Sequence, residues 1–226
     1  MDKSGREINR NKLIALLSDI LMEKNPEATI VTDSVTSMGL KKFIEDRKGK
    51  HHRFQRGYKN VINEAKRLNK KGIYTPLAIE TSGHAAFKDN YFLDDGAYMA
   101  AQLLVQLIKS KKEGRNFTDI LNELKEPVEE KEVRFPINTQ DFRETGNKIL
   151  NALPDYVKKV QGWKPEKPNY EGVRVICDEN SWFLLRLSLH EPLLCLNMET
   201  EEKGKVKDIE KKLYEFLKDY DEIDVS

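Results

Sequence analysis

The sequence predicts two domains of different class: a three-layer α/β/α domain with a mostly parallel sheet, followed by a smaller α+β domain with an antiparallel sheet. Two observations support this prediction. In the first half, short β-rich runs alternate with amphipathic helical patterns, as they do in βαβ units. In the second half, three β-rich runs follow one another directly, between two helical segments.

The first half begins with an amphipathic helix. Its apolar residues recur every three or four positions from Leu13 to Leu21, and Asn25-Pro26 ends it. The segments that follow alternate in type: strand 28–32, helix 38–46, strand 51–55, helix 58–68, strand 77–79 and, after the capping residues Asp94-Asp95-Gly96, a helix to about residue 108.

The ends of the three predicted strands are polar. In open α/β sheets, ligands bind just beyond the carboxyl ends of the strands. We therefore expect three stretches to gather along one edge of the sheet: Asp33-Ser34, Arg56-Gly57 and Glu80-Thr81-Ser82-Gly83-His84. The last stretch is the richest in chemistry, because it holds a carboxylate, two hydroxyls and an imidazole around a glycine.

A charged segment with little apolar periodicity, residues 110–135, separates the halves, interrupted by one short predicted helix at 117–124. It places the first domain at residues 10–125 and the second at 126–226. The elements expected in the second domain are a strand at 133–135, a helix at 139–160, a proline-bearing connector at 163–170, strands at 173–177, 182–189 and 193–198, and a final helix at 206–220.

Charge and composition exclude several classes of function. Lys and Arg number 39 against 38 Asp and Glu, so the chain lacks the basic excess of a sequence-independent nucleic-acid binder. No window is apolar enough for a signal peptide or a membrane span. Cys177 and Cys195 are far apart in strand-like runs, which favours buried, reduced thiols in a cytoplasmic protein. The four histidines and two cysteines have no zinc-ligand spacing.

The stretch from Glu80 to His84 has the chemistry of a sugar site. A carboxylate accepts hydrogen bonds and a hydroxyl two residues later both donates and accepts, so Glu80 and Ser82 suit a pair of vicinal sugar hydroxyls. Taken alone, a polar turn after a buried strand is the favoured interpretation. Gly57-Tyr58-Lys59 is likewise favoured as a plain helix start that happens to carry a lysine.

The run from Trp182 to Pro192 has the chemistry of an anion site. If it is extended, Arg186, Ser188 and His190 share one face, opposite the leucines of the run. Arginine suits phosphate because its planar fork donates two parallel hydrogen bonds. From the pattern alone, a half-buried strand with a solvated polar face is the favoured alternative.

Taken together, these stretches resemble the α-D-phosphohexomutases, the family of phosphoglucomutases and phosphomannomutases. Glu80-Thr81-Ser82-Gly83-His84 resembles the family's sugar-binding loop, G-E-x-S-G-H, and the run Arg186–Pro192 resembles its phosphate-binding loop, R-x-S-N-T-E-P. The chain departs from these motifs at four positions: Ile79 replaces the usual glycine, Thr81 stands where Met or Gln is frequent, and Leu189 and His190 replace Asn and Thr.

The resemblance implies a role for each matching side chain. By this resemblance, Glu80 and Ser82 bind the sugar hydroxyls, and His84 transfers a proton at the reacting end of the substrate. Lys59 helps to orient the substrate. The non-reacting phosphate is bound by Arg186, Ser188 and His190.

The resemblance also implies that only the last two of four domains are present. The family's catalytic serine loop and its Mg²⁺ loop belong to the first two domains and do not occur here, and residues 1–9 resemble a remnant of the preceding domain. The complete enzyme interconverts hexose 1-phosphate and hexose 6-phosphate through a phosphoserine and a bisphosphorylated sugar. The missing N-terminal domains and a hexose phosphate are thus the implied partners, and this part alone is expected to be inactive.

A rival interpretation is a stand-alone, non-catalytic module that binds sugar phosphates or a partner protein. A serine loop and an aspartate cluster encoded upstream of Met1 would favour the enzyme, and a genuine start site would favour the module. Glucose and mannose differ at one hydroxyl, and no residue of the sequence is assigned to read it.

Overall fold

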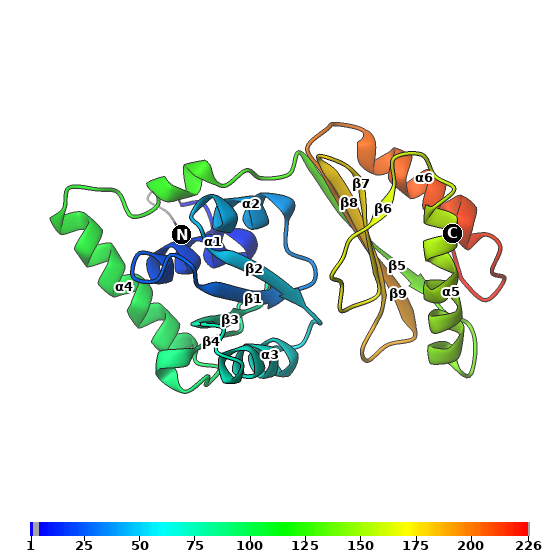
Figure 1. Ribbon diagram of the computed structural model, residues 1–226. Helices are drawn as coiled ribbons and strands as arrows, with labels where there is room; N and C mark the ends of the chain where they lie inside the picture. The colour runs from blue at the N-terminus through cyan, green and yellow to red at the C-terminus, as the bar shows by residue number, and fades with distance from the viewer. Residues whose placement is uncertain (2–4, 226) are drawn as a thin grey trace. The chain divides into compact units, whose positions relative to one another are not determined.

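The computed structural model describes residue 1 and residues 5–225, and it divides into two compact units, Met1–Glu126 and Pro127–Ser226 (Figure 1). The predicted remnant at residues 1–9 includes residues 2–4, which lie outside the described residues. No helix of the described part is long and apolar enough to cross a membrane.

The first unit contains a four-stranded sheet in the order β2-β1-β3-β4. The strands β1 (Thr29–Asp33), β2 (Lys50–Phe54) and β3 (Leu77–Ile79) run parallel. The fourth strand, β4 (Ala85–Phe87), is antiparallel to β3 and was not predicted. Three residues are too few to show a period, and alanine is depleted in strands, so only its pairing with β3 makes this segment a strand.

Helices cover both faces of this sheet, which confirms the predicted three layers (Figure 1). On one face, α1 (Arg10–Met22) and α2 (Met38–Asp46) pack against the apolar side chains of β1 and β3, and α4 (Gly96–Lys112) adds partly buried residues to the same cluster. On the other face, α3 (Tyr58–Lys70) packs its apolar stripe on Val31 and Ala78. Two short 3₁₀ helices complete the unit, η1 (Lys88–Asn90) and η2 (Asp119–Glu123), the second lying where a helix at 117–124 was predicted.

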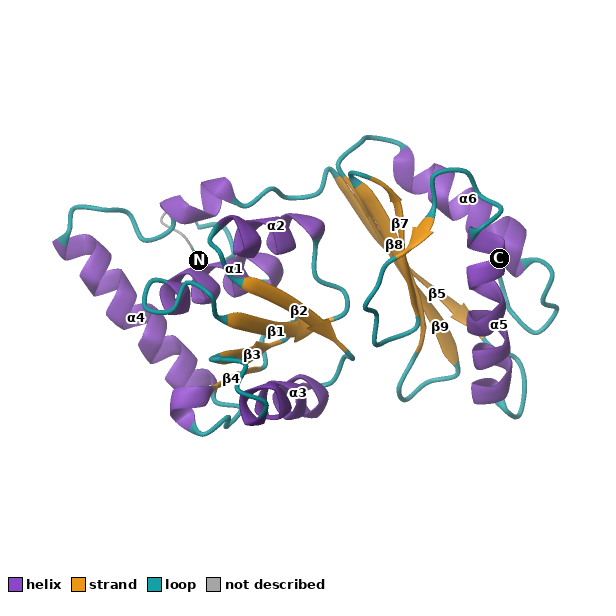
Figure 2. Ribbon diagram, viewed as in Figure 1, coloured by secondary structure: helices purple, strands orange, loops and turns teal. Residues whose placement is uncertain are grey.

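The second unit is an antiparallel five-stranded sheet with two helices on one face (Figure 2). Its strand order is β5-β9-β8-β7-β6, where the bounds are β5 (Glu129–Pro136), β6 (Lys164–Pro165), β7 (Val173–Asp178), β8 (Ser181–Leu187) and β9 (Leu193–Thr200). The helices α5 (Phe142–Val157) and α6 (Lys205–Leu217) bury the apolar face of the sheet. The predicted α+β class of this half is therefore confirmed.

Three strands of this unit differ from the expectation. The two-residue strand β6 lies within the segment predicted as a connector, 163–170. The strand expected at 182–189 ends at Leu187, because the chain then turns toward β9, and Leu189 is 44% exposed rather than part of the buried face. The strand β5 is eight residues long, against the three predicted, because its glutamates and lysine mask a strand that pairs with β9 along its whole length.

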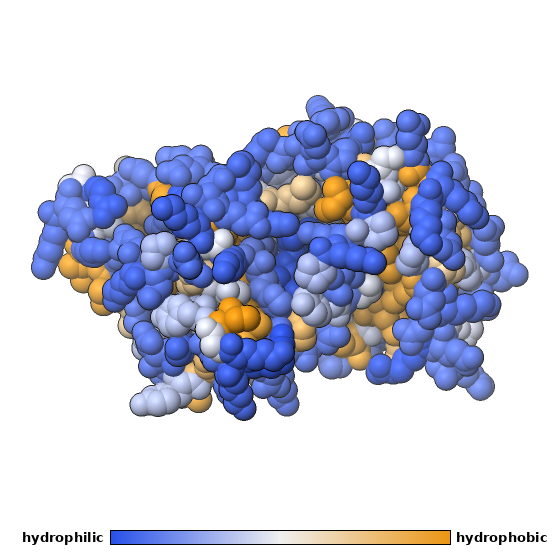
Figure 3. All heavy atoms as spheres, viewed as in Figure 1, coloured by the Kyte–Doolittle hydropathy of each residue, from blue (hydrophilic) through white to orange (hydrophobic). Residues whose placement is uncertain are grey.

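The surface follows the composition. Hydrophilic residues dominate the face drawn in Figure 3, as 34% charged residues predict. The helix α4 departs from this pattern, because Leu104, Val105 and Ile108 are exposed along it. Cys177 and Cys195 are buried and reduced, as expected, and burial raises the pKa of the Cys177 thiol.

Candidate functional site

The carboxyl ends of β1, β2 and β3 carry a connected group of polar residues. The backbone N–H of Gly57 donates to Glu80 Oε1 at 2.7 Å, and the Thr81 hydroxyl donates to Asp33 Oδ2 at 2.7 Å. Arg56 Nε lies 3.7 Å from the same Asp33 oxygen. Because parallel strands end at the same edge of a sheet, these three chain segments were expected to meet, and that expectation is confirmed.

Asp33 is the most deeply buried group of this edge, and its side chain has no solvent exposure. Burial raises the pKa of Asp33 to about 6, and the nearby carboxylate of Glu80 adds to this, whereas the Thr81 hydrogen bond and the Arg56 charge oppose it. Among the described residues, Asp33 Oδ1 has no hydrogen-bond partner. The sequence placed Asp33 at the sheet edge but gave it no role, although a carboxylate ending a fully buried strand was a usable signal.

The loop from Glu80 to His84 is a tight turn that fixes Glu80. The Gly83 N–H donates to the Glu80 carbonyl, and the Glu80 N–H donates to the His84 carbonyl, both at 2.9 Å. Gly83 has φ +97°, a conformation that side chains rarely adopt, so glycine is required there. Glu80 is 5% exposed, while Ser82 and His84 are exposed. The turn therefore holds one buried carboxylate and presents two polar side chains to solvent.

His84 has a carboxylate partner that the sequence did not identify. Its Nδ1 lies 2.7 Å from Asp94 Oδ2, and its ring lies 5.4 Å from the Tyr58 ring. The expected cap of α4 is made by Asp95 alone, whose side chain accepts the Tyr98 N–H. Because a carboxylate only accepts, Nδ1 of His84 donates to Asp94, and Nε2 is the ring nitrogen left for another partner.

Lys59 lies in the first turn of α3, directly after the predicted helix start. Gly57 precedes this helix with φ +105°, and the Lys59 ammonium lies 6.0 Å from the Tyr58 ring centroid. The side chain is exposed. Lys59 therefore lies two residues from the Gly57 N–H that holds Glu80.

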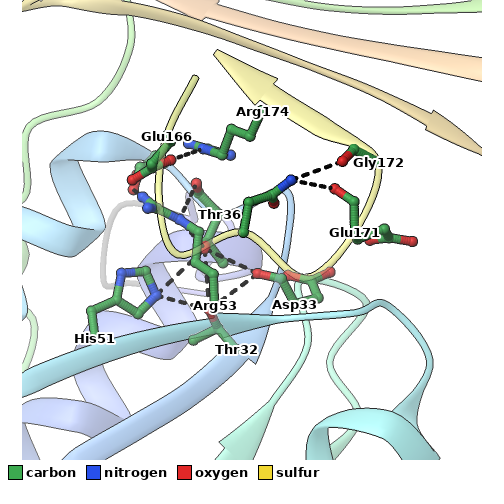
Figure 4. Close-up of polar contacts among 11 residues, drawn as sticks. Thr32, Asp33, Thr36, His51, Arg53, Glu166, Glu171, Gly172 and Arg174 are labelled. Carbon is green, nitrogen blue, oxygen red and sulfur yellow. Dashed lines mark hydrogen bonds and ion pairs between the residues drawn. The ribbon is translucent and has the colours of Figure 1, made fainter. Parts of the chain in front are cut away.

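A second polar network supports the turn after β1 (Figure 4). His51 Nε2 lies 2.8 Å from the Thr32 hydroxyl, Arg53 Nε donates to the Thr36 hydroxyl at 3.2 Å, and that hydroxyl donates to the Asp33 carbonyl at 3.2 Å. His52 lies on the opposite face of β2 and bonds a different residue, so the two adjacent histidines are not a ligand pair. This network fixes the chain on either side of Asp33.

The second unit brings the other predicted residues together at the turn between β8 and β9. Arg186 precedes the turn and is 6% exposed, and its Nε has no hydrogen-bond partner among the described residues. The Ser188 N–H donates to the Leu193 carbonyl at 2.9 Å, and the Ser188 hydroxyl accepts the Glu191 N–H at 3.4 Å. His190 is exposed at the tip. A buried guanidinium, a hydroxyl and an imidazole thus share one hairpin end.

Across residues 1 and 5–225, no group of three His, Cys, Asp or Glu side chains could hold a metal ion. A cavity of about 400 Å³ in the first unit lies between α1, η2 and the end of α4, and it contains none of the predicted site residues.

Comparison with known proteins identifies the family. Residues 9–127, more than half of the 226, match the family model described as phosphoglucomutase/phosphomannomutase, alpha/beta/alpha domain III. The chain belongs to the phosphoglucomutase/phosphomannomutase family. It is 28% identical over 208 residues to a phosphomannomutase/phosphoglucomutase of Pseudomonas syringae, which covers 92% of this chain and 41% of the relative. A phosphoglucomutase/phosphomannomutase of Thermococcus kodakarensis is 25% identical over 208 residues and covers 92% and 42%.

Solved structures agree with this assignment. A phosphoglucomutase/phosphomannomutase family protein from Burkholderia thailandensis superposes with a TM-score of 0.74 and 25% identity, covering 96% of this chain and 43% of that one. An N-acetylglucosamine-phosphate mutase in a substrate complex superposes with a TM-score of 0.56 at 14% identity, which shows a shared fold. The chain therefore spans about two fifths of the length of the relatives that it matches.

Proposed function

We propose that this chain is the substrate-positioning part of a phosphohexomutase, which interconverts hexose 1-phosphate and hexose 6-phosphate through a phosphoserine and a bisphosphorylated sugar. Family membership supports the reaction class. Phosphoryl transfer asks a protein mainly to position its substrate and stabilise charge, and the two groups of polar residues are suited to the first task.

The observation that carries the proposal is the way Glu80 is held. Its Oε1 accepts the Gly57 N–H, and the turn of residues 80–84 closes directly behind it, so the carboxylate is oriented before any ligand arrives. Oε2 of Glu80 and the exposed Ser82 hydroxyl then take a pair of vicinal sugar hydroxyls. A site whose groups are already fixed avoids the entropy cost of ordering them on binding.

The remaining residues serve the two ends of the sugar. His84, oriented by Asp94, exchanges a proton at the reacting hydroxyl through Nε2, and Lys59 orients the substrate beside it. The phosphate that does not react is held by Arg186 and Ser188, with His190 supplying a donor in place of the threonine seen in the family motif. Arginine donates two hydrogen bonds to one phosphate, and charged hydrogen bonds of this kind are the stronger class.

The chemistry of phosphoryl transfer itself is assigned to other parts of the longer enzyme. The relatives are more than twice as long as this chain, and the structure of one distant family member is described as a complex with GlcNAc-6P and magnesium. The described residues here supply no magnesium ligand group, so no step is assigned to the metal in this chain. We propose that the chain alone binds hexose phosphate weakly and turns none over.

Titration of glucose 1-phosphate into the full chain, followed by NMR, tests the binding role. We expect millimolar affinity, and we expect Glu80→Ala and Arg186→Ala each to weaken it about tenfold or more, since each removes hydrogen bonds to or from a charged group. Glu45→Ala, an exposed carboxylate on α2, is the matched control and leaves affinity unchanged. Unaltered binding in both test variants contradicts the proposal, and turnover of glucose 1-phosphate by the chain alone contradicts its inactivity.

A further inference from the structure

Two arginines lie in one row across the second sheet. Arg134 of β5 is opposite Cys195 of β9, and Cys195 is opposite Arg186 of β8. Residues that are opposite in register project from the same face of a sheet, so both arginines flank Cys195 on one face. Phe135 and Leu185, the neighbours in sequence, belong to the apolar core on the other face. With strands about 4.8 Å apart, the two Cα atoms are about 10 Å apart, which lets long side chains meet on one small anion.

Glu132 forms an ion pair with Arg134. Its Oε1 accepts from Arg134 Nε at 2.8 Å, and its Oε2 accepts from Asn197 Nδ2 at 2.9 Å. Burial opposes ionisation of Glu132, yet the hydrogen bonds from Arg134 and Asn197, and the charges of Arg134 and Arg186, hold its pKa below the ordinary value. Glu132 is therefore hydrogen-bonded to Arg134 and within electrostatic range of Arg186.

The end of β5 that carries Arg134 lies next to the turn between β8 and β9. The Ile137 N–H donates to the Pro192 carbonyl at 2.8 Å, so the end of β5 is bonded directly to this turn. Arg134 is also within electrostatic range of Glu191 in the turn. Arg186 contributes a buried Nε–H with no hydrogen-bond partner among the described residues, and an unmet buried donor is costly unless a ligand satisfies it.

The turn between β8 and β9 has few side-chain hydrogen-bond donors of its own. Leu189 is an exposed apolar residue and His190 an exposed imidazole, at the two positions where the family motif has small polar residues. A phosphate monoester carries close to two negative charges at neutral pH, and beside the Ser188 hydroxyl and the His190 imidazole this hairpin end offers it one guanidinium, that of Arg186. A second guanidinium from a neighbouring strand supplies the missing charge and two more N–H groups.

We propose that Arg134 is a second binding residue for the phosphate group, acting with Arg186 on a phosphate monoester dianion. This inference rests on the phosphate-binding role proposed for Arg186. In the ligand-free protein Glu132 holds Arg134 in place beside the turn, and the phosphate then binds between the two guanidinium groups.

The test compares four variants of the full chain, Arg134→Ala, Arg134→Lys, Arg186→Ala and Lys131→Ala, with inorganic phosphate and glucose 1-phosphate as probes and NMR as the readout. Arg134→Ala weakens the affinity for both probes about tenfold, as expected for the loss of a charged hydrogen bond. Lys131→Ala is the matched control, because Lys131 lies on the same strand, projects from the opposite face and has its own ion pair with Glu210 at 2.7 Å. The Arg134 Nε–H resonance shifts on phosphate addition in the wild-type chain and in Lys131→Ala.

The outcomes separate this inference from the proposed function. Wild-type affinity in Arg134→Ala, together with weakened binding in Arg186→Ala, overturns the inference and leaves the phosphate site at Arg186 standing. Wild-type affinity in both variants overturns both. Arg134 is 62% exposed, so its loss leaves the fold intact, and tryptophan fluorescence checks this because Trp163 and Trp182 both lie in the same unit. Arg134→Lys, which keeps the charge and loses the planar fork, binds phosphate with intermediate affinity, and an affinity no better than that of Arg134→Ala contradicts a role for its charge.

Discussion

The substitution Asp33→Asn removes a negative charge from the interior of the first unit while keeping the shape of the side chain. Asn still offers an oxygen to the Thr81 hydroxyl, so the contact at 2.7 Å has an acceptor in both proteins. The two side chains differ in charge, and burial disfavours the ionised form of the aspartate. We therefore expect the variant to be more stable than the wild-type chain at neutral pH and to lose this advantage in acid.

The magnitude follows from the pKa of Asp33. Burial raises it to about 6, against 3.8 for an ordinary aspartate. At about 1.36 kcal/mol per pKa unit, the ionised carboxylate costs the folded state about 3 kcal/mol. Because the pKa is higher in the folded state, the folded protein binds the proton more tightly. This contribution to stability is therefore complete below about pH 4 and is lost as the pH rises to about 6 and beyond.

Urea unfolding at pH 4 and pH 7.5 measures this effect. Far-UV circular dichroism follows both units, whereas fluorescence reports the second unit alone, because Trp163 and Trp182 both lie in it. We expect Asp33→Asn to exceed the wild-type free energy of unfolding of the first unit by about 3 kcal/mol at pH 7.5 and by well under 1 kcal/mol at pH 4. The same difference at both pH values would refute the assignment of the raised pKa to Asp33.

Two further perturbations test the packing of the first unit. Gly39→Ala places a Cβ 2.0 Å from the Lys125 carbonyl oxygen, so we expect the free energy of unfolding in urea to fall by at least about 1–3 kcal/mol. Gly96→Ala is the control, because its Cβ meets open space and stability should be nearly unchanged. Burial lowers the pKa of His52, so protonation of this residue opposes folding as the pH falls below about 6.5. The variant His52→Gln keeps a donor for Glu64 but does not titrate. We expect it to lose less stability than the wild-type chain between pH 7 and pH 5.

The sequence predicted the elements that have a period and missed those that depend on pairing. The alternation of apolar runs and amphipathic helices was sufficient for β1 to β3 and their helices, and with them for the edge where Asp33 and Glu80 meet. It was not sufficient for β4, whose three residues become a strand only beside β3. Of the highly charged β5 only residues 133–135 were predicted, because the rest of the strand is defined by long-range hydrogen bonds to β9.

The candidate site shows the same division. Glu80 and Arg186 could be named from the sequence, because each belongs to a short motif and its side chain has the chemistry expected of a binding residue. The carboxylate that orients His84 could not be named, since Asp94 reaches His84 only through a turn that brings two segments ten residues apart into contact. Arg134 is separated from Arg186 by 52 positions, and only the register of three strands places them in one row.

The Thr81 hydroxyl stabilises the buried carboxylate of Asp33. Thr81 departs from the Met or Gln frequent at this position of the family motif that residues 80–84 resemble, and its hydroxyl donates to the buried Oδ2 of Asp33. A methionine there would leave that oxygen with Arg56 alone, at 3.7 Å, and would raise the cost of keeping the carboxylate ionised. A protein can keep a destabilising buried charge where that charge holds a functionally important segment in place. Here the Asp33 carboxylate accepts the hydroxyl of the residue next to Glu80, so the stability lost by burying Asp33 at the end of β1 helps to fix the turn that carries the Glu80 carboxylate.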